Sequence, residues 1–321
     1  MIDICAVHGD RHAWEAYLTG FASDAPDYLR KFAIPLCERA GVDQGRFRSL
    51  LASNPNAAVH YLIDAGPGFN VSPASYFAEL DEQGVEHQVL HGFPWRGRSG
   101  SDPNRTIAEL AAAQPGRLTA WAGVSLRSPE QSARRVEQAA TEWNARGISI
   151  SPFWESIPAS DLSLKPIYDA AERLRLPIWI HAGQNFNTQT TLETSAVHHI
   201  DRVATAYPSL PIIIGHAGWP WIMDAVAVIQ RHHNVWLEFS SHRPSFMTRP
   251  GSGWEPLLLH ARGALRGKVM FGSAAWVSRK SISELAAEVQ SLPLADDIKA
   301  EWVAGNARAF LAAANRDARH G

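Results

Sequence analysis

The chain has 321 residues, of which 45% are hydrophobic and 19% are charged, and its formal net charge is −2. This composition is typical of a soluble globular protein, and it offers no basic stripe for nucleic acid or an anionic membrane. No apolar run reaches the roughly 18–20 residues of a membrane span. The two cysteines, Cys5 and Cys37, form no CxxC pair, so no disulfide framework is expected. We therefore expect a cytoplasmic protein whose partner is a small-molecule substrate.

Apolar runs rich in β-branched residues predict eight strands along the chain. They lie at residues 2–7, 85–91, 117–126, 148–153, 177–181, 212–216, 235–239 and 268–272. Helical patterns at residues 105–113, from 128 onward, and at 166–174, 197–207, 222–231 and 255–265 separate most of them. This alternation indicates βα units and a parallel sheet. We expect an α/β protein with a (β/α)8 TIM barrel, and a doubly wound open sheet is the alternative because periodicity does not distinguish the two.

The stretch between the first two strands is too long for one crossover. Its patches at residues 28–40 and 47–51 have a helical pattern. We therefore expect one barrel domain over residues 1–321, in which residues 10–79, approximately, form a cap-like helical insertion over the barrel mouth.

Two strands end on a histidine, and this is the main functional signal. The runs are Pro177–Gly183, which contains His181, and Pro211–Trp221, which contains His216. In a (β/α)8 barrel, polar residues at the carboxyl ends of strands are typical of catalysis. A neutral imidazole is able to accept or donate a proton near neutral pH. We predict that these two histidines are catalytic.

A second group of candidates follows the other strands. Glu238 lies within an apolar strand, where it either reaches the barrel mouth as a catalytic group or pairs with a helix residue. Arginine binds carboxylates with two hydrogen bonds, and large aromatic rings form apolar pocket walls. We predict that the following residues bind substrate, with surface exposure or core packing as the alternative for each: Trp95, Arg96, Trp154, Trp219, His242, Arg243 and Trp276.

Five motifs in order resemble the amidohydrolase-related superfamily. They are Leu80–Val85, Gln114–Leu118, the pair of histidine strands, Phe271–Ser273 and Gly305–Leu311. The resemblance covers about residues 80–313 and is greatest to the branch of aminocarboxymuconate-semialdehyde decarboxylase, the resorcylate decarboxylases and the pyrone-dicarboxylate lactonases. It implies a TIM barrel, with His181 as the fifth-strand metal ligand and His216 as the sixth-strand catalytic histidine.

Three of the metal-binding positions depart from the family pattern. Aligned without gaps, Cys5 and Val7 occupy the first-strand ligand positions, and Ala274 replaces the last-strand aspartate. A catalytic zinc normally holds three protein ligands. A site of His181, Cys5 and either Asp3 or His8 requires a bulge in the first strand. Our preferred interpretation is that no metal is tightly bound. The alternative is a single divalent metal such as zinc.

These observations favour a hydrolase that acts on a small cyclic or aromatic acid derivative through strand-end histidines, with weak metal dependence or none. A metal-dependent non-oxidative decarboxylase of an aromatic acid is the first alternative. A barrel that has lost catalysis and binds a ligand or partner is the second, because Val7 and Ala274 stand at former ligand positions. The resemblance also implies a homodimer.

Overall fold

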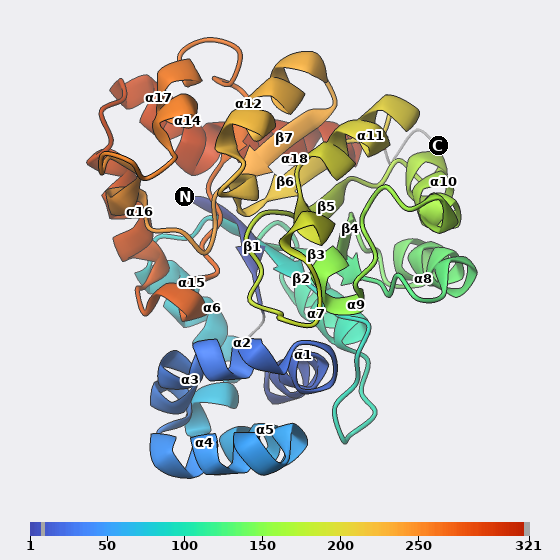
Figure 1. Cartoon of the computed structure of the whole chain (residues 1–321), viewed down its shortest axis with the longest axis vertical. Helices are drawn as coiled ribbons and strands as arrows, with labels where there is room; N and C mark the ends of the chain where they lie inside the picture. Colours follow the sequence, from blue (N-terminus) through green and yellow to red (C-terminus); the bar gives the residue numbers. More distant parts are fainter. Residues whose placement is uncertain (8–9, 318–321) are drawn as a thin grey trace.

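A computed structural model describes residues 1–7 and 10–317 of the chain. Eight parallel strands lie side by side in sequence order, which confirms the predicted (β/α)8 TIM barrel (Figure 1). The strands are β1 (Ile2–Ala6), β2 (His87–His91), β3 (Leu118–Gly123), β4 (Ile148–Ile150), β5 (Ile178–His181), β6 (Ile212–Gly215), β7 (Val235–Glu238) and β8 (Val269–Met270). The backbone N–H of Ile4 donates to the carbonyl of Phe271 at 3.1 Å, which brings the last strand against the first.

Helices that lie between the strands or follow the last one surround the barrel. They are α7 (Pro103–Ala113), α8 (Pro129–Glu142), α9 (Pro152–Glu155), η2 (Leu162–Leu164), α10 (Lys165–Arg173), η3 (Leu192–Ser195), α11 (His198–Ala206), η4 (His216–Gly218), α12 (Ile222–Arg231), α13 (Pro244–Met247), α14 (Glu255–His260), α15 (Ala275–Ser278), α16 (Ile282–Gln290), α17 (Asp296–Ala300), the π-helical turn η5 (Glu301–Gly305) and α18 (Asn306–Asp317). The predicted fourth strand ends early, because Pro152 has no N–H for a strand ladder and begins α9 instead.

The strand side chains alternate between the barrel interior and the surrounding helices, as the pleat requires. On β5 and β6, Ile178 and Ile212 pack in the cluster formed with the outer helices. Trp179 and Ile213 belong to a separate cluster with Ile4 in the barrel interior. The barrel is therefore a packed core rather than a pore.

Six α-helices between β1 and β2 cover one end of the barrel (Figure 1). They are α1 (Arg11–Asp24), α2 (Pro26–Lys31), α3 (Ala33–Ala40), α4 (Gln44–Ser53), α5 (Pro55–Ala65) and α6 (Pro73–Glu82), with the short turn η1 (Pro67–Phe69) before α6. The predicted helix over residues 28–40 is two helices, because Pro35 has no N–H to bond the carbonyl of Lys31. Phe153 and Trp154, which follow β4, pack in the aromatic core of these helices.

The cap helices therefore face the carboxyl ends of the strands. Within the described ranges 1–7 and 10–317, no helix combines the length and apolar character needed to cross a bilayer.

Candidate active site

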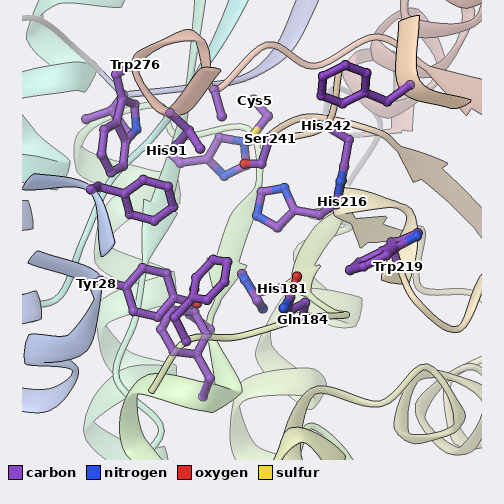
Figure 2. Close-up of a pocket in the computed structure, with 18 of the residues that line it drawn as sticks. Cys5, Tyr28, His91, His181, Gln184, His216, Trp219, Ser241, His242 and Trp276 are labelled. Carbon is purple, nitrogen blue, oxygen red and sulfur yellow. The ribbon is translucent and has the colours of Figure 1, made fainter. Parts of the chain in front are cut away.

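A cavity of about 570 Å³ lies between the carboxyl ends of the barrel strands and the cap helices. Figure 2 shows His181 and His216 facing this space, with Tyr28 and Trp276 on the side of the cap. Most of the wall is aromatic. The cap contributes Tyr17, Phe21, Tyr28 and Phe32, and the barrel and its loops contribute the imidazoles of His91, His181, His216 and His242.

The two predicted catalytic histidines lie together in this cavity. Their ring centroids are 4.8 Å apart and the ring planes meet at 75°. His181 is only 6% exposed, its ring packs 4.4 Å from that of Phe153, and its Nδ1 has no hydrogen-bond partner among the described residues. Because Nδ1 is buried, Nε2 is the ring nitrogen that is open to the cavity.

Backbone geometry at the end of β6 sets the position of His216. The residue has φ of 54°, a left-handed conformation that is uncommon outside glycine. Its N–H donates to Oε1 of Glu238 at 2.8 Å, and its Nδ1 lies 2.8 Å from the hydroxyl of Ser240. These contacts fix the ring at Nδ1, so Nε2 is the nitrogen available to a substrate.

Burial keeps the cavity imidazoles neutral. It lowers the pKa of His216 to about 4, that of His91 to about 4 and that of His242 to about 3. It lowers the pKa of His181 well below the ordinary value, and the neighbouring His216 adds to the effect. At neutral pH these groups are unprotonated, and each is a stronger acid than an ordinary imidazolium once it has accepted a proton.

His91 is a site residue that the sequence interpretation did not single out. Its Nε2 lies 2.9 Å from the carbonyl of Ile4, which is only an acceptor, so Nε2 carries the proton. Its Nδ1 is buried without a partner in the described chain. The signal was available, because β2 also ends on a histidine, as β5 does.

Glu238 does not line the cavity, although we predicted a catalytic role for it. Its side chain is completely buried and accepts hydrogen bonds from the indole of Trp179 at 3.0 Å and from the N–H groups of His216 and Ser240 at 2.8 and 2.6 Å. A Cβ on Gly272 would lie 2.4 Å from its Oε2, so this approach requires glycine. Glu238 is therefore placed to position His216 rather than to touch substrate.

The first strand does contain an irregularity of the kind that a metal site would require. The register of β1 against β2 shifts between Asp3 and Ala6, and Cys5 lines the cavity. Asp3, however, is buried in a network with Ser273 and Gln88 and lies outside the cavity lining. Burial raises its pKa to about 6.

The donors that line the cavity do not fit a tightly held metal. Val7 and Ala274 both face it, and neither has a ligand atom. Burial raises the pKa of the Cys5 thiol well above its usual value, so this one lining thiol is protonated unless a metal displaces its proton. No three His, Cys, Asp or Glu side chains in residues 1–7 and 10–317 are grouped to hold an ion. His8, the remaining predicted ligand, lies outside the described residues.

Three of the predicted substrate-binding residues line the cavity. They are Trp219, His242 and Trp276. The ring of His242 lies 5.6 Å from that of Trp219 and 5.1 Å from that of Trp254, so it is held between two indoles.

The two other predicted tryptophans lie elsewhere, which corrects their assignment. Trp95 donates from its indole to Asp24 at 2.8 Å, and its ring contacts that of Trp154 at 4.2 Å. Trp154 is buried in the aromatic core of the cap. Neither residue lines the cavity, because both are used to join the cap to the barrel.

The two predicted arginines also lie outside the cavity. Arg96 forms an ion pair with Asp102 at 2.7 Å, and Arg243 pairs with Glu288 of α16. The cavity instead contains Arg249, from the loop after α13, whose guanidinium lies 4.1 Å from the ring centroid of Phe246. Arg249 is the only lining residue, among the described part of the chain, with a formal charge at neutral pH.

Comparison with known proteins places this site in a family. A family model described as Amidohydrolase matches residues 63–312. The chain belongs to the amidohydrolase family. A curated relative, gamma-resorcylate decarboxylase of Polaromonas sp. strain JS666, is 25% identical over 213 residues, which are 52% of this chain and 61% of the relative. The match thus spans less than two thirds of that relative.

Two solved structures share the fold. An uncharacterised TIM-barrel protein of Bordetella bronchiseptica is 21% identical with a TM-score of 0.68, covering 98% of this chain and all of its own. The 5-carboxyvanillate decarboxylase of Novosphingobium aromaticivorans DSM 12444, solved with manganese and 4-hydroxy-3-methoxy-5-nitrobenzoic acid, is 16% identical with a TM-score of 0.57. It covers 97% of this chain and 94% of its own.

Proposed function

We propose that this enzyme of the amidohydrolase superfamily is a carboxy-lyase that removes CO₂ from a small aromatic acid without an oxidant. The observation that carries the proposal is the aromatic cavity whose single charged lining residue, within the described ranges, is Arg249. The gamma-resorcylate decarboxylase relative supports the same reaction class. This reverses our order of preference from the sequence, in which hydrolysis came first.

The cavity suits a flat anionic ring. Aromatic walls from both the cap and the barrel loops offer contact to the two faces of such a ring. Arg249 is exposed at the rim, where its charge would attract an anionic substrate and hold an acidic substituent. No Asp or Glu lines the cavity, within the described residues, to repel it.

The imidazole pair would move the proton that decarboxylation requires. The substrate enters as the carboxylate, so His216 takes up a proton from solvent, and burial makes the resulting imidazolium a readier proton donor than an ordinary one. The imidazolium then donates this proton to the ring carbon while the bond to the carboxylate carbon breaks. The electron pair of that bond forms the new C–H bond, and CO₂ leaves. His181, through its Nε2, would orient the carboxylate beside His216.

Hydrolysis of a reactive cyclic ester is the second candidate, and one observation favours it. The cavity has two adjacent neutral imidazoles but does not bring together a metal-binding set in the described residues. A neutral imidazole is able to activate water towards a lactone without a metal.

An isotope experiment separates the two reactions. Candidate aromatic acids labelled with ¹³C at the carboxyl group, and lactones in H₂¹⁸O, are incubated with the enzyme and followed by NMR and mass spectrometry. Release of ¹³CO₂ with formation of a C–H bond supports the lyase. Incorporation of ¹⁸O into an acid product supports the hydrolase instead. Saturable binding of the acids without either product would refute both and favour the ligand-binding barrel.

We also propose a homodimer, which the resemblance implied. Static light scattering of the full chain tests it, and a monomer mass at micromolar concentration would contradict it.

A further inference from the structure

A second cavity, of about 440 Å³, lies beside the first, between the cap and the segment that leads into α16. The two cavities share Ala6, Val7 and Trp276 as their common wall. Their chemistry differs, because the second is lined by five charged side chains from α3, α6 and residues 279–280. The proposed reaction makes no use of this space.

Arg39 is the most informative residue of the second cavity. Its guanidinium carbon lies 4.7 Å from the ring centroid of Trp14 and 5.5 Å from that of Phe69. Its Nε is buried without a hydrogen-bond partner, and it forms no ion pair with any residue in the described ranges. A guanidinium stacked on aromatic rings with its edge unpaired is preorganised to bind an oxyanion.

Among the described residues, Arg39 is the cation of this lining that no carboxylate pairs. Arg279 and Lys280 are the other cations, and Glu38 and Glu79 are the two acids. Arg279 pairs with Glu38 and Lys280 pairs with Glu284, each at 2.6 Å, whereas Glu79 accepts from the amide of Gln83 at 2.9 Å. The guanidinium of Arg39 is therefore the lining cation left to bind an anion.

We propose that this second cavity binds a small oxyanion, presented by a carboxylate or a phosphate group, through the guanidinium of Arg39. Two parallel N–H···O bonds from a guanidinium fit either group. Because Trp14 and Trp276 also line this cavity, an anion there would contact indoles. The inference does not depend on decarboxylation, since it concerns binding outside the proposed active site.

Calorimetric titration of the full chain with inorganic phosphate and with succinate, at fixed ionic strength, tests the proposal. At least one anion is expected to bind at a single site, and which one binds separates a phosphate ligand from a carboxylate ligand. Arg39→Gln is expected to weaken binding by about tenfold or more, the loss of a charge-assisted hydrogen bond. Glu79→Gln is expected to strengthen it.

Two controls keep the test specific. Arg46→Gln removes another stacked arginine of the cap, 4.8 Å from the Tyr61 ring centroid, and is expected to leave binding unchanged. Arg249→Gln removes the cation of the first cavity and is also expected to have no effect on this site. Should Arg39→Gln not fold, Arg39→Lys keeps the charge but loses the planar fork, and severalfold weaker binding is expected.

The proposal is overturned if neither anion binds wild type at millimolar concentration. It is also overturned if Arg39→Gln binds as wild type does, or if Arg249→Gln abolishes the signal. A loss of binding in Arg249→Gln would assign the anion to the first cavity.

Discussion

Replacing Glu238 by glutamine tests whether one buried carboxylate positions the catalytic imidazole. Oε1 accepts from the indole of Trp179 and the N–H of His216, and Oε2 accepts from the N–H of Ser240. Glutamine has nearly the same shape but only one acceptor oxygen. Whichever way the amide is turned, its NH₂ group faces at least one N–H donor.

The loss of stability in Glu238→Gln is set by the more favourable of the two orientations of the glutamine amide. The amide oxygen then keeps Trp179 and His216, and the N–H of Ser240 loses its partner. Leaving a buried N–H without its partner costs roughly 1–3 kcal/mol, and more where the lost partner is charged. We expect Glu238→Gln to lower the free energy of unfolding by about 2–3 kcal/mol.

Urea unfolding followed by circular dichroism measures this change. Glu86→Gln is a suitable control, because Glu86 and its ion-pair partner Arg308 are each 55% exposed at the side chain. Such a pair contributes about 1 kcal/mol or less. The reasoning is refuted if Glu238→Gln unfolds within about 1 kcal/mol of wild type with an unchanged dependence on urea.

Three further predictions concern the rim, the pH and the metal. Arg249→Gln should raise KM for the aromatic acid about tenfold with little change in kcat. Arg96→Gln, which lies outside the cavity, should change neither constant. A KM in Arg249→Gln equal to that of wild type would contradict substrate binding by Arg249. Burial lowers the pKa of His91 and of His216 to about 4, so the unfolded chain binds more protons between pH 6.5 and 4. The free energy of unfolding should fall as pH drops through this window, by up to about 1.4 kcal/mol per pH unit for each histidine. His91→Asn should make the unfolding free energy less dependent on pH. A urea midpoint that does not change with pH would contradict the conclusion that these buried histidines are neutral. Protein purified without a tag should hold well under one equivalent of zinc or manganese by elemental analysis, and a stoichiometric metal that survives dialysis would show that the donor set has been misjudged.

The barrel and its paired histidines could be predicted because they depend on local pattern. The three isoleucines of β6 (Ile212–Gly215) are apolar and β-branched, and such residues favour a buried strand. His216 then follows at the carboxyl edge of the barrel. His91 shows the same pattern and could have been assigned by the same argument.

The arginines could not be assigned, because partners distant in sequence decide where a long side chain lies. Arg243 pairs with Glu288, 45 residues away, whereas Arg249 has no ion-pair partner among the described residues and reaches the cavity. Glu238 was ambiguous for a related reason. Its direction depends on the close approach that Gly272 permits, which no pattern within β7 indicates.

The most direct test of the account is the single-turnover rate of His216→Asn on the acid that the ¹³CO₂ screen identifies. The asparagine amide is able to keep the contact with Ser240 but has no group that titrates near neutral pH. His198→Asn removes an exposed imidazole at the start of α11 and serves as the matched control. The account predicts a loss of about 10²–10⁴-fold for His216→Asn, the usual contribution of a general acid–base group, and no loss for the control. Wild-type turnover in His216→Asn would contradict it.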